Sequence, residues 1–153
     1  MIQDSLRNIK MGGKFTAELI NDKTGEIEGK FFAKNVVLDV AYQAMAGGFI
    51  PAQATIIAVG TGSNTPLSSD VGLQTQIAQS GGTFERITDY SWKVIAYFET
   101  GQANGSLREL GAKNNTHFLN RALFKDDQDS PITIVKSSLQ LLKVTMEFEI
   151  VRI

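Results

Sequence analysis

The chain has 153 residues, a length that fits one domain built around one hydrophobic core. Hydrophobic residues make up 42% of the chain and charged residues 20%, which is typical of a globular protein and not of a disordered one. With 15 Lys and Arg against 16 Asp and Glu the formal net charge is -1, and no segment concentrates basic residues, so the composition argues against nucleic-acid binding. The absence of cysteine excludes disulfides and thiolate chemistry.

The beginning of the chain carries no apolar run of the kind that a signal peptide needs. No segment approaches the roughly 20 apolar residues that span a bilayer. We therefore expect folding in the cytosol and no membrane partner. Residues 1–13 have little periodicity and end in two glycines, so we expect an N-terminal arm or loosely held lead-in there, with a disordered terminus as the alternative, followed by a single domain over residues 14–153.

Residues 14–32 are predicted to form a hairpin, because apolar and polar side chains alternate on both sides of a turn at residues 21–25. A turn centred on Lys23 would oppose Phe15 with Phe31. The same register opposes Glu18 with Glu28, an unfavourable pair of like charges. Either a lysine such as Lys30 relieves that pair or a bulge shifts the register, and the sequence leaves both open.

Residues 35–46 are predicted to form the one helix of the chain. Val37, Val40, Ala41 and Ala44 recur at helical spacing, Asn35 is a suitable N-cap, and two glycines follow the segment. The helix would bury one apolar stripe against a sheet.

Residues 54–59 form a short apolar run that is typical of a buried strand, and Gly60-Thr61-Gly62 follows it. This glycine pair superficially resembles a phosphate-binding loop, but a third glycine and a Lys-Ser/Thr pair are missing, so we favour a turn by which the chain leaves the sheet. Residues 64–70 are predicted to be a loop whose serines cap a short helical turn through Gln76.

Further strands are predicted at residues 92–98, 106–111, 118–124 and 142–150. Many short strands, glycine-rich turns and one helix indicate an all-β protein, an antiparallel β-sandwich of jelly-roll-like type with the helix packed on it. The strand at 92–98 is apolar on both of its faces. We therefore place Ile95 and Tyr97 hypothetically at an interface between subunits.

The sequence offers little catalytic chemistry. His117 is the only histidine, which with the lack of cysteine rules out a Cys-His pair and a three-histidine metal site within one chain. No Gly-x-Ser-x-Gly motif is present to supply a serine nucleophile, so we expect His117 to have a surface or hydrogen-bonding role. A carboxylate pair such as Glu99 with Glu109 stays open. We predict no catalytic residue, no cofactor and no metal ligand.

Two groups of charged residues have structural interpretations. Asp126, Asp127 and Asp129 could hold a hard cation such as Ca²⁺, but they lack EF-hand spacing, and a solvated turn is the favoured interpretation while cation binding stays open. If the chain turns near residue 114, Arg108 and Arg121 lie nearly opposite each other, and Glu109 is within one position of the partner of Arg121. The favoured interpretation is an exposed and weak Glu109–Arg121 pair, and the alternative is a bidentate ion pair that fixes the register of the hairpin or bridges to a neighbouring subunit.

Several stretches, in order along the chain, resemble the small structural proteins of tailed-bacteriophage virions. The resemblance lies in the helix start Lys-Asn-Val-Val-Leu-Asp-Val-Ala at 34–41, in Ile-Ala-Val-Gly-Thr-Gly at 57–62 followed by Thr-Pro-Leu at 65–67, in Ala-Asn-Gly-Ser-Leu-Arg-Glu-Leu-Gly at 103–111 and in Leu-Asn-Arg-Ala-Leu-Phe at 119–124.

This resemblance implies a non-enzymatic virion subunit of the tail, collar or baseplate, made in the host cytoplasm, with copies of itself and other virion proteins as partners. The alternatives are a capsid decoration protein and a carbohydrate-binding module of a phage appendage. The last would bring a weak contact with host glycans through exposed aromatic residues, for which Tyr90 and Trp92 are the candidates, although the alternating position of Trp92 favours the core. A hydrolase that uses Glu109 or His117 is a third class.

Overall fold

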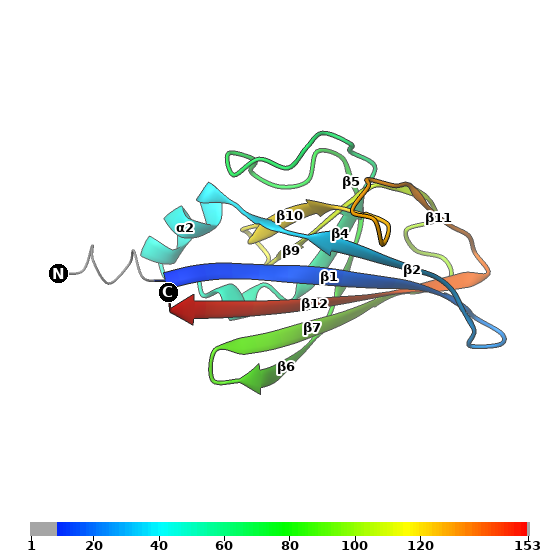
Figure 1. Ribbon diagram of the computed structural model, residues 1–153, viewed down its shortest axis with the longest axis horizontal. Coiled ribbons are helices and arrows are strands. Elements are labelled where there is room, and N and C mark those ends of the chain that lie inside the picture. Colours follow the sequence, from blue (N-terminus) through cyan, green and yellow to red (C-terminus); the bar gives the residue numbers. More distant parts are fainter. Residues whose placement is uncertain (1–8, 153) are drawn as a thin grey trace.

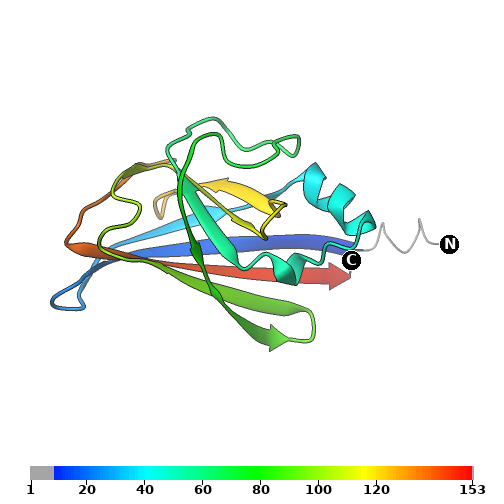
Figure 2. The ribbon, with the colours of Figure 1, turned by 180° about the vertical axis from the view of Figure 1, so that it is seen from behind.

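The computed structural model describes residues 9–152, and these form an antiparallel β-sandwich with one α-helix, as the sequence predicts. Figure 1 looks onto the first sheet, with the second sheet behind it, and Figure 2 gives the opposite view. In order across it, sheet 1 contains β2 (Ile27–Lys34), β1 (Ile9–Asn21), β12 (Gln140–Arg152), β7 (Ser91–Phe98) and β6 (Thr83–Thr88).

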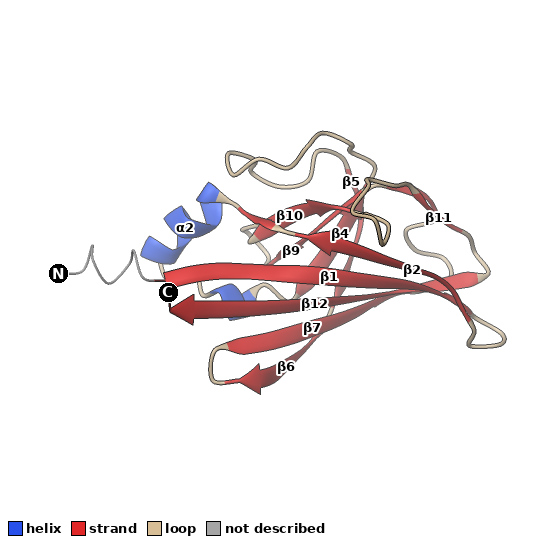
Figure 3. Cartoon of the chain, viewed as in Figure 1, coloured by secondary structure: helices blue, strands red, loops and turns tan. Residues whose placement is uncertain are grey.

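Sheet 2 contains, in order across it, β3 (Val36–Val37), β10 (Asn120–Leu123), β9 (Glu109–Lys113), β4 (Ile56–Gly60) and β5 (Gln76–Gly81). A separate antiparallel pair is formed by β8 (Gly105–Leu107) and β11 (Ile134–Lys136). The helix α2 (Asp39–Ala46) and the short 3-10 helix η1 (Pro51–Gln53) lie together at one end of the sandwich, coloured blue in Figure 3. No helix within residues 9–152 is long and apolar enough to cross a bilayer.

The core lies between the sheets because the strands alternate apolar and polar side chains. In β12, Val144, Met146 and Phe148 are buried, whereas the residues between them point away from sheet 2. In β9, Leu110 and Ala112 point into the same core. The core is therefore made by the inward faces of both sheets, as the alternation in the sequence predicts.

Two strands bend from one sheet into the other. β2 continues into β3 after Asn35, and β5 continues into β6 across Gly82. A Cβ atom at Gly82 would stand 2.5 Å from Val94 Cγ1, so this corner accommodates only a glycine without rearrangement. The N–H of Gly82 donates to the carbonyl O of Thr55 at 2.7 Å, which joins the corner to sheet 2.

The predicted hairpin is present, and a bulge sets its register. Phe15 lies opposite Ala33, not Phe31, and a shift between Leu19 and Ile20 accommodates the extra residue. Glu18 consequently lies opposite Lys30, which replaces the unfavourable like-charge pair by an opposite-charge pair.

The predicted N-terminal arm is wrong for residues 9–13, which belong to β1 and pair with the end of β12. Glycines at 12 and 13 weaken the apolar alternation there, so the sequence pattern does not reveal the strand. Residues 1–8 of the predicted arm lie outside the described residues.

The helix is shorter than the predicted range 35–46. It begins at Asp39, because Val36 and Val37 pair with β10 as strand β3. Asn35 is not its N-cap: its side-chain Oδ1 accepts the N–H of Gly13 at 2.8 Å, and Leu38 occupies the N-cap position without a side-chain hydrogen bond. Long-range strand pairing therefore overrides the local helical pattern.

The middle of the chain differs from the prediction in two further ways. Residues 61–75 form a loop without the predicted helical turn, and Gln76 begins β5. The single strand predicted over 106–111 is divided at Arg108 into β8 and β9, since the two pieces pair with different partners, β11 and β4.

Candidate interaction surface

The outer faces of the two sheets differ in what covers them. On sheet 2, the loop of residues 61–75 lies over the outward-facing side chains of β9 and β10 and is seen at the top of Figure 1. Beneath it, Glu109 and Arg121 are almost completely buried, and Ala58 is fully buried although it points away from the core. This face of the protein is therefore occupied by the chain itself.

Glu109 holds the covering loop through its carboxylate. Its Oε2 accepts the backbone N–H groups of Gly62 and Thr75, each at 2.8 Å, and its Oε1 accepts the N–H of Gln74 at 2.7 Å. The guanidinium of Arg121 donates from Nε to the same Oε1 at 2.9 Å. Both ends of the loop are thus attached to one charged side chain on β9.

Arg121 extends this network to the middle of the loop. Its Nη1 donates to Oδ2 of Asp70 at 3.1 Å, while its Nε contacts Glu109. The predicted Glu109–Arg121 contact is present, but it is not bidentate, because the guanidinium divides its donors between two carboxylates. The favoured interpretation of an exposed pair is wrong: Arg121 is 1% exposed and Glu109 is fully buried.

The pKa of the Glu109 carboxyl is shaped by opposing effects. Burial alone would raise this pKa, since a charge is taken out of water. The hydrogen bonds from the N–H of Thr75, from the Arg121 guanidinium and from the N–H groups of Gln74 and Gly62 together outweigh burial and hold the pKa below its ordinary value. Glu109 is therefore ionised in the folded protein, and its charge strengthens the hydrogen bonds that it accepts.

We expect the protein to lose stability in acid through Glu109. The unfolded chain binds a proton near the ordinary pKa of glutamate, about 4.3, whereas the folded chain binds it at lower pH. The contribution of Glu109 is therefore complete above that pH and is lost as the pH falls through the folded pKa. Urea unfolding between pH 7 and pH 3 should show a steeper loss for the wild type than for Glu109→Gln. Parallel curves for the two proteins would contradict this assignment.

The close approach of Glu109 explains the two glycines that resemble a phosphate-binding loop. A Cβ atom at Gly60 would stand 2.7 Å from Glu109 Oε2, and one at Gly62 would meet the same oxygen and the side chain of Gln74. A bound anion would compete with a carboxylate that already holds the local N–H group. The glycines thus serve a turn against Glu109, as the favoured interpretation predicts.

The burial of Glu109 also argues against a catalytic carboxylate pair formed by Glu99 and Glu109. A glycosidase carboxyl must reach its substrate, but both oxygens of Glu109 are enclosed and hydrogen-bonded within the protein. Glu99 is exposed, and its backbone carbonyl O accepts a hydrogen bond from the buried Lys136 at 2.9 Å. Glu109 is therefore unsuited to act as an acid or base on a substrate from solution.

Sheet 1 presents a different outer face. Ile95 and Tyr97 point away from sheet 2 on β7, and Phe32 does so on β2. Tyr97 is 44% exposed and Phe32 is 40% exposed. Within residues 9–152 no segment crosses this face over β1, β12 and β7 (Figure 1). The two residues predicted at a subunit interface thus lie on one uncovered surface.

Charged side chains surround the apolar ones on this face. Lys14 on β1 lies 3.4 Å from Glu147 on β12, and Lys93 on β7 lies 3.6 Å from Glu85 on β6. Pairs as exposed as these contribute less than about 1 kcal/mol each. They give the face a defined pattern of charge more than they stabilise the sheet.

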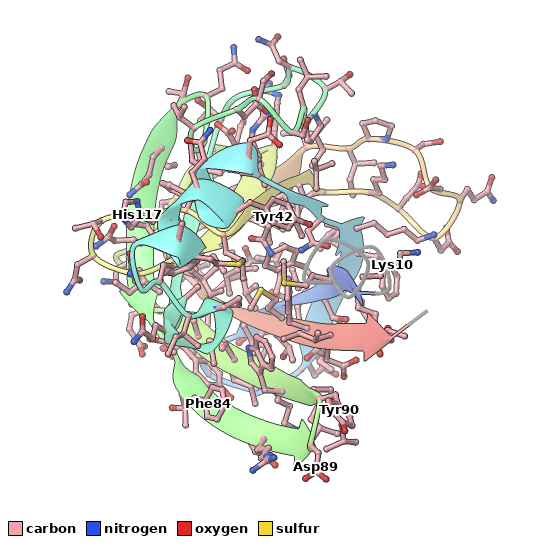
Figure 4. The ribbon with its side chains drawn as sticks, turned by 90° about the vertical axis from the view of Figure 1, so that its left-hand side faces the viewer. Lys10, Tyr42, Phe84, Asp89, Tyr90 and His117 are labelled. Carbon is pink, nitrogen blue, oxygen red and sulfur yellow. The ribbon has the colours of Figure 1, made fainter. Side chains whose placement is uncertain are left out.

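The candidate aromatic residues for glycan binding do not form a common platform. Trp92 is only 7% exposed and points into the core, where its ring lies 5.2 Å from Phe148 and 6.4 Å from Phe84 between ring centroids. Tyr90 is 70% exposed at the β6–β7 turn. Figure 4 shows Phe84 and Tyr90 on this hairpin at the edge of the sandwich. Trp92 is therefore a core residue, as its alternating position favours, and is not available as a glycan-binding platform.

The remaining candidates occupy turns. His117 is exposed beside the β9–β10 turn, and its ring packs edge-on against Phe49 at 6.0 Å between centroids. In the acidic turn, Asp126 Oδ1 accepts the N–H groups of Gln128 and Ser130, and Asp129 lies 3.3 Å from Lys125. Among the described residues no group of three His, Cys, Asp or Glu side chains is arranged to hold a metal ion.

Sequence reasoning missed several residues of these surfaces. Asp70 lies 51 residues from Arg121, and nothing in the local sequence indicates their contact. Lys136 is buried with its ammonium bonded to Asn104 Oδ1 at 2.8 Å, and burial lowers its pKa while Glu99 opposes that shift. Phe32 could have been found, since its outward position follows from the alternation in β2.

Comparison with protein-family models, with curated protein sequences and with solved structures finds no match to this chain.

Proposed function

We propose that the chain is a non-enzymatic structural subunit of a tailed-bacteriophage particle, located in the tail, collar or baseplate. It assembles by packing the outer face of sheet 1 against other subunits. Its partners are copies of itself and other virion proteins, and its final location is the virion.

The observation that carries this proposal is the contrast between the two outer faces. The chain covers sheet 2 with its own loop and holds that loop with a buried charged network. Sheet 1 keeps Ile95 and Tyr97 on a face that no described segment crosses over β1, β12 and β7, and Phe32 lies at the β2 edge of this face, where Lys125 of the acidic turn pairs with it. Exposed apolar patches framed by polar residues are typical of protein–protein contacts.

Two further observations support the proposal. The resemblance of residues 34–41, 57–67, 103–111 and 119–124 to small phage structural proteins points to the virion. The enclosed carboxylate of Glu109 and the exposed position of His117 fit a structural role better than a hydrolytic one.

The test is incorporation into particles of the phage that encodes the chain. A phage carrying Ile95→Lys should package at least tenfold less of this protein than the wild type, since a charge then lies at the contact and must be desolvated. Leu67→Lys is the matched control, because Leu67 is 57% exposed on the loop over sheet 2. Quantitative mass spectrometry of purified particles measures both. Wild-type protein that is absent from purified particles would contradict the proposal.

A further inference from the structure

We propose that the outer face of sheet 1 pairs with the same face of a second copy, about a two-fold axis that runs between β1 and β12 parallel to the strands. This inference rests on the proposed function, because it names the partner of the same face. It follows from the strand register, which places the side chains of four strands in rows across the face.

Two of the rows are charged. From β2 to β7, the first charged row contains Lys34, Lys14, Glu147 and Lys93. The second charged row contains Lys30, Glu18, Lys143 and Tyr97. Successive outward residues of one strand lie two positions apart, so one further row separates these two.

The rows beside them are uncharged. The threonine row, between the two charged rows, contains Phe32, Thr16, Thr145 and Ile95. The aliphatic row, beyond the second charged row, contains Ile27, Ile20 and Leu141. The small threonine side chains therefore occupy the centre of the face, and larger apolar side chains lie around them.

The four central charges form a checkerboard around the threonines. Lys14 and Lys143 occupy one diagonal, and Glu18 and Glu147 occupy the other. Rotation by 180° about an axis in the plane of the face, parallel or perpendicular to the strands, places each of these lysines against a glutamate of the second copy. With the axis parallel to the strands, Lys14 meets the partner's Glu147, and Glu18 meets the partner's Lys143. A C2 contact requires this kind of self-complementary surface.

The apolar residues select this axis over the perpendicular one. With the parallel axis, each row meets the same row, so Phe32 lies over the partner's Ile95 and Ile20 lies over the partner's Leu141. Lys30 then faces the ring of the partner's Tyr97, a favourable cation–π arrangement. A perpendicular axis through the threonine row would instead lay Ile20 over the partner's Gly12 and Leu141 over the partner's Glu149. Each axis opposes one pair of outer lysines, Lys34 with the partner's Lys93 under the parallel axis and Lys34 with the partner's Lys30 under the perpendicular one, so the aliphatic row decides between them.

The size of the face predicts a reversible contact. Four strands about 4.8 Å apart and seven residues of about 3.3 Å rise give a plan area of about 400 Å². Standard interfaces bury about 800 Å² per partner. Because side chains make the surface uneven, the buried area exceeds the flat area of the face, but the face remains small for an interface. Packed sheets cross at about 30°, so the contacts concentrate on the central rows. We expect a dimer that forms at high concentration and that neighbouring subunits stabilise in the particle.

Sedimentation velocity over a range of protein concentrations tests the pairing. We expect a monomer–dimer equilibrium for the wild type, and at least a tenfold higher dissociation constant for Thr145→Arg, whose long side chain keeps the two faces apart. Thr65→Arg on the exposed loop over sheet 2 is the matched control and should dimerise as the wild type does. Thermal unfolding followed by circular dichroism checks that each variant is folded. A wild type that stays monomeric to its solubility limit, or a dimer unaffected by Thr145→Arg, would overturn the proposal.

Charge exchange tests the axis. Lys14→Glu alone should weaken the dimer at least tenfold. The double variant Lys14→Glu/Glu147→Lys should restore it under the parallel axis, because both partners of the contact are exchanged. Restoration by Lys14→Glu/Glu18→Lys instead would show the perpendicular axis and overturn the one proposed. A monomeric protein that is nonetheless packaged in particles would refute the pairing and leave the virion role intact. A dimer of this geometry that is absent from particles would support the pairing and refute the virion role.

Discussion

Replacing Arg121 with methionine is expected to lower the free energy of unfolding by about 3–5 kcal/mol, because it leaves buried carboxylate charge without its partner. Arg121 is 1% exposed and joins Glu109 on β9 to Asp70 on the covering loop. For a domain of this size, such a loss corresponds to a melting temperature lower by about 10 °C. Urea unfolding and differential scanning calorimetry measure both quantities.

The control for this variant is Arg86→Met. Arg86 also bonds an aspartate, with its Nη2 3.1 Å from Asp89 Oδ1, but its side chain is 64% exposed. An exposed pair of this kind contributes less than about 1 kcal/mol. If Arg121→Met were no more destabilising than Arg86→Met, the buried network would not be what holds the loop on sheet 2.

Replacing Gly60 with alanine is expected to cost about 3 kcal/mol, the upper part of the range for inserting a methyl group into a closely packed site. The new Cβ would press against the carbonyl O of Thr75 and stand 2.7 Å from Glu109 Oε2. Neither neighbour can move without breaking a hydrogen bond to Glu109, so the strain is not relieved by a side-chain rotation. Chemical unfolding of the purified variant provides the measurement.

Gly81→Ala is the matched control on the adjacent strand β5. A Cβ atom there meets nothing within 4 Å. The change should be neutral or stabilise by up to about 1 kcal/mol, since alanine restricts the unfolded chain more than glycine does. Equal stabilities of the two variants would mean that the loop does not pack against Gly60 as described.

The sequence was informative where one strand face is apolar and the other polar. The alternation in β7 and β12 predicts the sandwich and identifies Ile95 and Tyr97 as outward residues of an apolar strand. The helix was predicted too long because Val36 and Val37 fit a helical stripe as well as they fit strand β3, and only the pairing with β10 decides between the two. The like charges that the simplest register opposes suggested a bulge in the hairpin, but the sequence did not show where the bulge lies.

The loop over sheet 2 could not be predicted from its own residues. It is polar and contains glycine and proline, which is typical of exposed loops, and its attachment depends on Glu109 and Arg121 far along the chain. Sequence spacing brought Glu109 and Arg121 together across one turn, but their burial follows from the loop that covers them. For the same reason, the sequence could not tell which outer face stays uncovered.

The most direct measurement of the central claim is a cryo-electron microscopy map of the intact phage particle, at a resolution that traces this chain. The account predicts several symmetry-related copies in the tail, collar or baseplate, with Ile95 and Tyr97 buried against a neighbouring subunit. Copies on the outer surface of the head would indicate the decoration role instead. Copies in which the outer face of sheet 1 faces solvent, or a particle that lacks the chain, would contradict the account.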